Sequence, residues 1–445
     1  MGKYHFIAIG GIGMSGLAKY LLEDGHSVSG SDIADSKYVD KLRKLGAKIY
    51  IGHNAENVPE GSIVIVSTAI RKNNPELVKA REMGLKIYHR SDMLKEIAEM
   101  AQKSGNKFIG FSGTHGKTTT SGLASFVLDK AGLNPSFVDG GIVPELSTNA
   151  QHKKGKHFIA ELDESDGTIV KYSPDVLVIN NLEEDHIDFY KNGMIDLIKT
   201  FETAISKAKK VIVNNDNEGI NLLKGDFITF GLKNADYTAK NINITKEGTA
   251  FDIYHKGELL TSISIQLAGI HNVYNTLSVI AGLCEANVDI EKIRPYFKEF
   301  TGMGRRFQKV TEFNGIEVFD DYAHHPTEIR ATLDAAASKY GKENIVAVFQ
   351  PHRYTRLKSL WNEFLKAFEN SGRVIVTDVY AASEDPIEGI TGKNFASKLP
   401  NSEYISGNME EVASSLLPTL SKGNIVIGLG AGTITALGKD LEKAQ

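Results

Sequence analysis

The chain has 445 residues, and its 51 basic and 55 acidic residues nearly cancel to a formal net charge of −4. This length predicts two or three domains, and the balanced charge argues against a nucleic-acid partner. No apolar run approaches the roughly 20 residues of a membrane span, no signal peptide begins the chain and the single cysteine excludes an internal disulfide, so we expect a cytoplasmic protein without a membrane partner.

The first hundred residues alternate short apolar runs with helical patterns. Residues 4–9, 63–67 and 85–88 are short and apolar, as expected for strands, whereas residues 14–23 have the spacing of a helix. This alternation predicts parallel α/β layers.

A glycine turn follows the first predicted strand. Gly11, Gly13 and Gly16 have the spacing of a dinucleotide-binding turn, and Asp32 ends the second predicted strand, where a carboxylate can bind a ribose hydroxyl. The turn favours a diphosphate-bearing ligand over a plain tight turn. It does not distinguish NAD from a UDP-linked ligand, because a helix N-terminus binds any pyrophosphate. The residues assigned to this site are Gly11, Ile12, Gly13, Met14, Ser15 and Asp32.

A polar segment at residues 103–107 precedes a second α/β run, which contains a phosphate-loop pattern. Residues 113–120 read Gly-Thr-His-Gly-Lys-Thr-Thr-Thr between a predicted strand and a predicted helix. Such a loop directs backbone N–H groups and the positive end of the helix dipole at phosphates. Lys117 adds an ammonium group for the β- and γ-phosphates, and Thr118 adds a hydroxyl for Mg²⁺. We therefore predict a nucleoside triphosphate site, although the longer form of the pattern has a glycine where this chain has Phe111.

Acidic segments follow two later strands of this run. Residues 161–167 read Glu-Leu-Asp-Glu-Ser-Asp-Gly, which is either a solvated loop or a magnesium-binding segment, because Mg²⁺ takes oxygen ligands. Glu161 is the favoured ligand because it is closest to the strand predicted at residues 158–162. The strand predicted at residues 176–180 leads to His186, which lies between acids. From the residues alone, a structural role and a metal or phosphate role are equally open for this histidine.

The pattern changes between residues 237 and 267, where short alternating strands separated by glycine turns predict a small antiparallel sheet. A long helix is expected at residues 271–285. Asn272 has the character of a helix N-cap, and Asn275 lies one turn further along the same face. Amides can read an adenine edge, but capping is the simpler interpretation of these residues taken alone.

Glycines at residues 302–304 mark a second expected boundary. Arg305 and Arg306 follow it, and paired arginines either bind anionic oxygens or form surface ion pairs. The segments at residues 320–326 and 350–356 each follow a strand, which is where α/β domains bind ligands. Strands are expected in this region at residues 345–349, 374–377 and 425–429.

With these motifs in order, the chain resembles the Mur ligase family over essentially its whole length. Leu162 stands where the family commonly has alanine, and Thr433 where it has aspartate or serine, but neither is an expected ligand. The motifs that carry the resemblance are at residues 10–16, 113–120, 163–166, 184–186, 271–275, 304–307, 321–326 and 349–353.

The resemblance implies a three-domain α/β fold. We expect an N-terminal Rossmann-like UDP-substrate domain at 1–104, a central ATP-binding domain with the small antiparallel sheet at 105–302, and a C-terminal Rossmann-like domain at 303–445. The resemblance also implies ATP and Mg²⁺ as cofactors, and UDP-N-acetylmuramate and L-alanine as substrates that are joined through an acyl phosphate in peptidoglycan precursor synthesis. We expect a monomer or weak homodimer.

The family's functional residues map onto matching positions of this chain. The implied catalytic residues are Lys117, Glu161, His186 and Arg306, and the implied magnesium ligands are Thr118, Glu161 and His186. The implied ATP-binding residues are Gly113, Thr114, His115, Gly116, Lys117, Thr118, Thr119, Asn272, Asn275, Arg306 and Asp321. His325 and Arg353 are candidates for holding substrate carboxylates on the UDP-substrate side.

Three other interpretations are open at this stage. A nicotinamide dehydrogenase would explain the first glycine turn, but it would leave the phosphate loop and the acidic strand ends unused. A non-catalytic nucleotide-binding regulator would not need the complete set of Lys117, Glu161 and His186. Within the family, the nearest alternative is a recycling ligase that joins a tripeptide to the same UDP-sugar.

Overall fold

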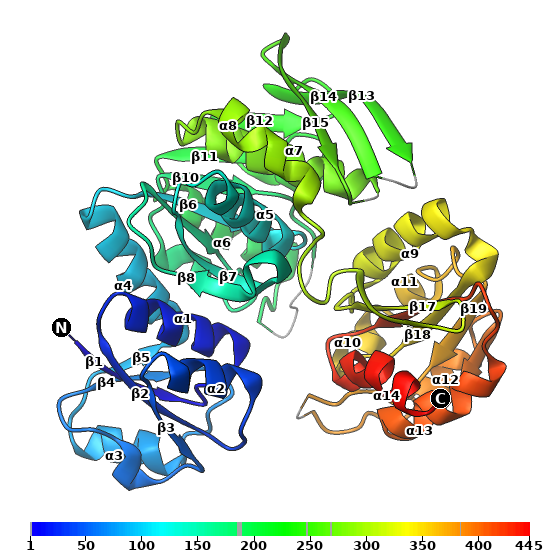
Figure 1. Cartoon of the computed structure of the whole chain (residues 1–445), viewed down its shortest axis with the longest axis horizontal. Coiled ribbons are helices and arrows are strands. Elements are labelled where there is room, and N and C mark those ends of the chain that lie inside the picture. Colours follow the sequence, from blue (N-terminus) through cyan, green and yellow to red (C-terminus); the bar gives the residue numbers. More distant parts are fainter. Residues whose placement is uncertain (1, 185–188, 246–247, 268, 383) are drawn as a thin grey trace. The chain divides into compact units, whose positions relative to one another are not determined.

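The computed structural model describes residues 2–184, 189–245, 248–267, 269–382 and 384–445. The chain divides into two compact units (Figure 1). The first unit consists of Met1–Ile242, Ala250–Ile265 and Val273–Thr301, and the second consists of Asn243–Thr249, Gln266–Asn272 and Gly302–Gln445.

The first unit begins with a parallel five-stranded sheet in the order β3-β2-β1-β4-β5. The strand order changes direction at β1, so the crevice beyond its carboxyl end is the expected place for a ligand. The strands are β1 Lys3–Ile7, β2 Ser27–Asp32, β3 Lys48–Ile51, β4 Ile63–Val66 and β5 Ile87–His89. The helices are α1 Ile12–Glu23, α2 Lys37–Lys44, α3 Pro75–Glu82 and α4 Arg90–Lys103.

A ten-stranded sheet in the order β15-β14-β13-β12-β11-β10-β6-β9-β7-β8 follows, and most of its residues belong to the first unit. Its strands are β6 Lys107–Ser112, β7 Ser136–Val143, β8 Thr148–Gln151, β9 His157–Glu161, β10 Val176–Ile179, β11 Lys210–Asn214, β12 Ile228–Gly231, β13 Tyr237–Thr245, β14 Gly248–His255 and β15 Glu258–Ile265. Strand β6 lies between β9 and β10 and runs parallel to both. The carboxyl ends of these three strands therefore meet at one edge.

The short strands predicted between residues 237 and 267 are present as β13, β14 and β15, and they extend this large sheet. Phe230 of β12 pairs with Tyr237 of β13, and β14 and β15 follow β13 in the sheet order. The turn between β14 and β15 uses positive φ values at Lys256 and Gly257, as expected for a tight hairpin.

Helix α5, Lys117–Lys130, is the helix that follows the phosphate loop. All of its residues from Thr119 to Leu128 are buried, and its Phe126 packs against Phe300 with ring centroids 5.5 Å apart. Burial on this scale fixes the helix, and with it the loop at its N-terminus. The other helices beside this sheet are α6 Met194–Ile205, α7 Ile270–Glu285 and α8 Ile290–Ile293.

The second unit contains a six-stranded sheet in the order β16-β17-β21-β18-β19-β20, in which only β16 is antiparallel to its neighbour. The strands are β16 Gln308–Phe313, β17 Ile316–Asp321, β18 Ile345–Phe349, β19 Arg373–Val376, β20 Ser402–Tyr404 and β21 Ile425–Leu429. The helices are α9 Pro326–Tyr340, α10 Tyr354–Ser359, α11 Trp361–Leu365, α12 Gly392–Ala396, α13 Met409–Leu416 and α14 Leu437–Lys443.

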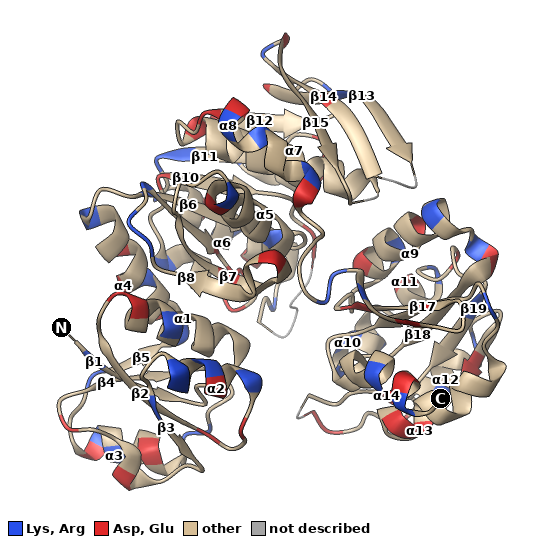
Figure 2. Ribbon diagram, viewed as in Figure 1, with Lys and Arg blue, Asp and Glu red and all other residues tan. Residues whose placement is uncertain are grey.

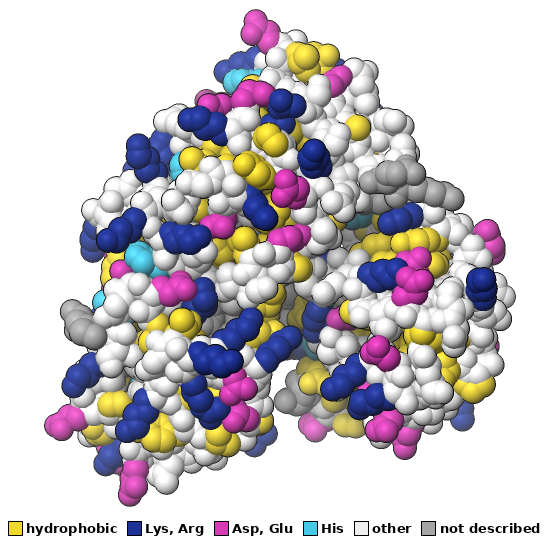
Figure 3. Space-filling view, viewed as in Figure 1, with side chains coloured by type: hydrophobic (Ala, Val, Ile, Leu, Met, Phe, Trp, Pro, Cys, Tyr) yellow, Lys and Arg dark blue, Asp and Glu magenta, His cyan; other side chains and the backbone are white. Residues whose placement is uncertain are grey.

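Charges of both signs are distributed over the helices of each unit (Figure 2). In the space-filling view, lysine and arginine side chains gather over α2, but Arg43 of that helix is paired with Asp35 and Asp40 (Figure 3). Within the described part of the chain, no helix is long and apolar enough to cross a membrane.

Two expectations about the long helix α7 can be compared with the structure. Its range, 270–285, agrees with the predicted 271–285. The prediction that Asn272 caps the helix is wrong, because Asn272 is the third residue of α7 and its side chain contacts the ring of His271 instead.

Candidate active site

The phosphate loop joins β6 to α5, as the sequence predicts. Gly113 and Gly116 have φ values of +123° and +81°, in the region that residues with a Cβ rarely adopt. A Cβ on Gly113 would lie 2.9 Å from the carbonyl oxygen of Asn181, so the loop passes too close to that backbone for a larger residue. Gly116 is the residue immediately before α5, and the first N–H groups of the helix are therefore available to an anion.

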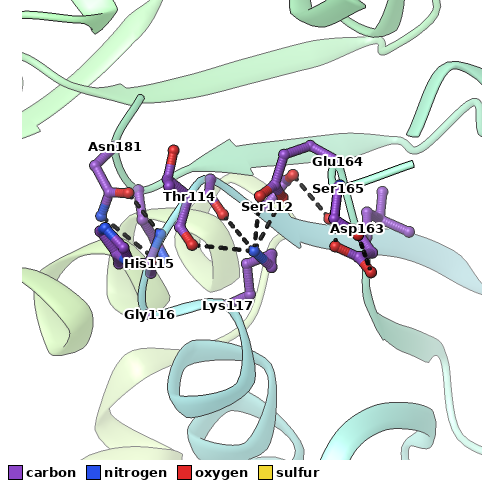
Figure 4. A network of polar contacts seen from close by, with 12 residues as sticks. Ser112, Thr114, His115, Gly116, Lys117, Asp163, Glu164, Ser165 and Asn181 are labelled. Carbon is purple, nitrogen blue, oxygen red and sulfur yellow. Dashed lines mark hydrogen bonds and ion pairs between the residues drawn. The ribbon is translucent and has the colours of Figure 1, made fainter. Parts of the chain in front are cut away.

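The Lys117 ammonium group lies at the centre of the loop (Figure 4). Its Nζ donates to the carbonyl oxygens of Gly113 at 2.8 Å and Thr114 at 3.1 Å, and it forms an ion pair of 3.0 Å with Glu164. Burial lowers the pKa of Lys117, but the surrounding carboxylates, Glu164 foremost, raise it by more. Lys117 is therefore a cation at physiological pH. Burial raises the pKa of Glu164 to about 7, against the opposing effect of Lys117.

The segment after β10 braces the loop from the other side (Figure 4). The Asn181 side chain accepts from the backbone N–H of His115 at 2.7 Å and donates to the carbonyl oxygen of the same residue at 3.1 Å. The Thr114 hydroxyl accepts from the backbone N–H of Glu183 at 2.9 Å. These bonds hold the loop in shape before any phosphate is bound, which lowers the entropy cost of binding.

Glu161 is the last residue of β9, and the structure fixes its carboxylate beside β7. The backbone N–H of Gly140 donates to Glu161 Oε2 at 3.0 Å. A Cβ on Gly140 would lie 2.2 Å from the same oxygen, so only glycine permits this approach. Asp139, the preceding residue, is 2 % exposed, and burial raises its pKa well above the ordinary value.

A cavity of about 80 Å³ lies beside Glu161. Gly13 of the first glycine turn lines one part of it, and Asp139 and Glu161 line another. Arg90 also lines the cavity and contacts Asp163 at 3.4 Å. The cavity therefore connects the first glycine turn to the acidic edge of the ten-stranded sheet.

The first glycine turn and Asp32 lie together, as predicted. The backbone N–H of Gly10 donates to Asp32 Oδ2 at 2.8 Å, and α1 begins at Ile12. The carbonyl oxygen of Ile12 accepts from Asn149 at 2.7 Å. Beneath Asp32, the Ser31 hydroxyl donates to the fully buried Glu76 at 2.6 Å, which fixes the end of β2.

The remaining predicted residues of the first unit have the following positions. Thr118 and Thr119 are the second and third residues of α5, directly after Lys117. Asn275 of α7 approaches the loop closely enough that a Cβ on Gly116 would lie 2.7 Å from its side-chain oxygen. His186 lies outside the described residues, as do residues 185, 187 and 188.

In the second unit, Asp321 holds the segment that contains the paired arginines. Its carboxylate is 3 % exposed and accepts from the backbone N–H groups of Phe307 at 2.8 Å and Ala323 at 2.7 Å. Burial raises the pKa of Asp321 to about 6, although Arg306 lowers it. The guanidinium of Arg306 lies over the ring of Tyr322, 5.4 Å from its centroid. Through these hydrogen bonds, Asp321 fixes the backbone on both sides of it, whatever ligand it is predicted to bind.

His325 and Arg353 occupy special backbone positions in the second unit. His325 is the N-cap of α9, where its ring accepts from the backbone N–H of Thr327 at 3.3 Å. Arg353 has a φ of +69°, which is rare for a residue with a side chain and is a form of strain that gathers at functional sites. It precedes α10, and its N–H donates to the carbonyl oxygen of Tyr380 at 2.9 Å.

A ring cluster lies beside Arg353 at the carboxyl ends of β17 and β18. The ring of His352 stacks on Tyr380 at 5.5 Å and meets the ring of His324 at 5.8 Å. Burial, assisted by Arg356, lowers the pKa of His352 to about 4, and burial lowers that of His324 to about 3. Both rings are therefore neutral near pH 7.

Sequence reasoning passed over four residues that the structure places at this site. Glu164 pairs with Lys117, Arg90 and Asp139 line the cavity, and Asn181 braces the phosphate loop. Glu164 and Asn181 lie in the polar segments that follow the strands predicted at residues 158–162 and 176–180. Their position after these strands could have identified them as candidates. Arg90 and Asp139 lie in no recognised pattern.

Three family models together match most of the chain. The model described as "Mur ligase family, catalytic domain" matches residues 3–102 and the "Mur ligase middle domain" matches residues 79–283. The "Mur ligase, glutamate ligase domain" matches residues 305–432.

Curated relatives match over nearly the full length. A protein of Geotalea uraniireducens named UDP-N-acetylmuramate–L-alanine ligase is 43 % identical, over 99 % of this chain and 97 % of its own length. A protein of the same name from Geotalea daltonii is 41 % identical, with the same shares covered.

Solved structures give the same result. The crystal structure of UDP-N-acetylmuramate–alanine ligase MurC from Thermotoga maritima has a TM-score of 0.85 and 29 % identity, and covers all of both chains. A murein peptide ligase from Psychrobacter arcticus has a TM-score of 0.73 at 20 % identity, over 100 % of this chain and 98 % of its own, which shows a common fold alone. The three-domain α/β fold expected from the sequence is thereby confirmed, and the chain belongs to the Mur ligase family.

Proposed function

We propose that this chain is an ATP-dependent ligase that joins L-alanine to the lactyl carboxylate of UDP-N-acetylmuramate, releasing ADP and phosphate, in cytoplasmic peptidoglycan precursor synthesis. The observation that carries the proposal is the identity of about 40 % or more to curated ligases of this specificity over almost the entire chain. The preformed phosphate loop around Lys117 supplies the chemistry that such a reaction needs.

The reaction must first activate a carboxylate, which is a poor electrophile at neutral pH. Transfer of the γ-phosphoryl group of ATP to a lactyl oxygen gives an acyl phosphate, and attack by the alanine amine then forms the amide and expels phosphate. Phosphoryl transfer depends on positioning and charge neutralisation more than on covalent help from the protein. The Lys117 ammonium and the N–H groups at the start of α5 provide both at one place.

The carboxylates on the adjacent strands β7 and β9 fit a hard divalent cation. Glu161 presents a carboxylate that the Gly140 N–H orients, and Asp139 presents another that is buried without a hydrogen-bond partner among the described residues. We propose that Thr118, Glu161 and His186 hold Mg²⁺, which when bound would neutralise phosphate charge.

The UDP-sugar is assigned to the first glycine turn. The N–H groups at the start of α1 suit its pyrophosphate, and Asp32 at the end of β2 suits a ribose hydroxyl. The cavity that connects Gly13 to Glu161 gives the sugar and its lactyl group a route toward the phosphate loop.

Further roles are proposed from the family motifs. Asn275 serves the adenine side of ATP, Asn272 belongs to the ATP site, and Arg306 and Asp321 serve the phosphate and ribose. His325 and Arg353 hold substrate carboxylates, and the strained backbone of Arg353 supports a functional role. The proposed domains are residues 1–104, 105–302 and 303–445, and the proposed assembly is a monomer or weak homodimer.

Phosphate release tests the acceptor specificity. The purified protein is given ATP, Mg²⁺ and UDP-N-acetylmuramate, with L-alanine, glycine, L-serine or the tripeptide in separate reactions. We expect release that depends on L-alanine. Phosphate release with the tripeptide alone would instead identify the recycling ligase. If none of the acceptors gave phosphate release, both assignments would be rejected.

A further inference from the structure

Asp139 is a buried carboxylate in β7. It is 2 % exposed, and neither of its oxygens has a hydrogen-bond partner among the described residues. Ser121 and Ser125 of α5 face it and partly offset its burial, but neither makes a hydrogen bond of ordinary geometry with it. Burying a carboxylate without a partner costs several kcal/mol, so a fold that keeps one has a use for it.

Sheet register places Asp139 next to Glu161. Strands β7 and β9 are parallel, with Phe137 opposite Ile159 and Val138 opposite Ala160. Continuing this register by one residue puts Asp139 opposite Glu161. Neighbouring strands lie about 5 Å apart, which brings the two carboxylates within reach of one ion. Both residues also line the same cavity.

The charges around this cavity favour a cation. Asp139, Glu161 and Asp163 line it, and Arg90 is the one basic residue among the described residues of the lining. Arg90 is engaged with Asp163 at 3.4 Å, and the nearby Lys117 is engaged with Glu164 at 3.0 Å. Among the described residues, neither of these bases forms an ion pair with Asp139.

We propose that Asp139 is an additional ligand, direct or through one water, of the divalent cation that Glu161 binds. The proposal rests on the proposed function only in identifying that cation as Mg²⁺. Carboxylate oxygens are its preferred protein ligands, and Mg²⁺ keeps several of its waters, so a second carboxylate can be reached through one of them. Residues beyond the inner ligands change metal affinity by about 10- to 100-fold.

Binding of Mn²⁺ to the nucleotide-free protein, followed by electron paramagnetic resonance, tests this assignment. Asp139→Asn keeps the shape and removes the charge. We expect it to weaken Mn²⁺ binding at least about 10-fold relative to the unaltered protein. Glu161→Gln should weaken it as well, whereas the control Asp226→Asn, which changes an exposed acid, should leave it unchanged.

Equal Mn²⁺ affinity in Asp139→Asn and the unaltered protein would overturn the assignment. So would a higher KM for the UDP-sugar with unchanged Mn²⁺ affinity, because the carboxylate would then serve the sugar. Thermal unfolding checks that the variant is folded, and Asp139→Ser, which also removes the charge, takes its place if it is not. Because Mn²⁺ binding is measured without ATP or acceptor, loss of the ligase assignment would leave this result interpretable.

Discussion

Lys117 is held in place before any phosphate arrives. Its ammonium group touches Glu164 and two backbone carbonyl oxygens, so its long side chain has already lost most of its rotamer freedom. A phosphate therefore meets a charge that needs little reorganisation, which is the condition under which such groups contribute most to catalysis.

Lys117→Ala should lower kcat by at least about 100-fold, the scale for removing one preorganised charge from a transition state. The matched control is Lys130→Ala, at the other end of the same helix, where the lysine lies 4.0 Å from Glu299. Steady-state phosphate release measures both variants. Near-normal turnover of Lys117→Ala would remove this residue from the mechanism.

Gly140→Ala should raise the Mg²⁺ concentration needed for half-maximal activity. Its φ is not in the left-handed region, so the backbone accepts alanine, but the new Cβ would lie 2.2 Å from Glu161 Oε2 and displace that carboxylate. Glu161→Gln should shift the magnesium requirement in the same direction. A magnesium titration that is unchanged in both variants would reject Glu161 as a ligand.

The buried histidines of the second unit predict a loss of stability in mild acid. The pKa values of His324 and His352 are lowered to about 3 and about 4 from an ordinary 6.5. Below pH 6.5 the unfolded chain takes up protons that the folded unit does not, so stability falls as pH falls toward these values.

Replacing both His324 and His352 by Gln should therefore reduce the stability lost between about pH 7 and about pH 5. For each replaced ring, we expect the free energy of unfolding to fall by about 1 kcal/mol less than in the unaltered protein, after allowing for the partial exposure of the rings. Urea unfolding at the two pH values measures it. An identical loss in the variant and in the unaltered protein would show that these rings are not the source.

Residues with a local signature could be predicted from the sequence, whereas those that depend on sheet order could not. Lys117 and Thr118 follow from the glycine spacing alone. Glu164 became identifiable as the partner of Lys117 only once β9 was known to lie beside β6. Asp139 has no local signature, because its neighbour Glu161 comes from another strand.

At the scale of elements, the strands were predicted well because each is a short, continuous run of apolar residues. The predicted ranges 345–349 and 425–429 are those observed for β18 and β21. Pairing was harder, because it is set by contacts distant in sequence. The strands at residues 237–267 were predicted, but the pairing of Phe230 with Tyr237 that joins them to the central sheet could not be predicted from the sequence.

Packing of strand β18 contributes to the stability of the second unit, because its last residue, Phe349, packs against other phenylalanine rings. Phe349 is fully buried, and its ring lies 5.4 Å from that of Phe364 and 5.2 Å from that of Phe368. Phe349→Ala should lower the free energy of unfolding by about 3–5 kcal/mol, through lost burial and the cavity left behind.

Urea unfolding measures the effect of Phe349→Ala, with Leu222→Ala as a control at a side chain that is 52 % exposed. The control should change stability by no more than about 0.5 kcal/mol. A loss in Phe349→Ala that is no greater than in the control would contradict the packing described for β18.

At the scale of the whole molecule, the family relationship unites features that are ambiguous one at a time. The first glycine turn alone fits a dehydrogenase as well as a UDP-sugar enzyme, and the shortened phosphate loop alone is a weak signal. Full-length similarity to Mur ligases explains both in one chain.

One labelling experiment tests the proposed reaction most directly. UDP-N-acetylmuramate carrying ¹⁸O in both lactyl carboxylate oxygens is incubated with the protein, ATP, Mg²⁺ and L-alanine, and both products are analysed by mass spectrometry. We predict a UDP-sugar that has gained one alanine and kept one labelled oxygen, and phosphate that carries the other. Unlabelled phosphate would contradict the acyl phosphate route, and a UDP-sugar without alanine would contradict the proposed function itself.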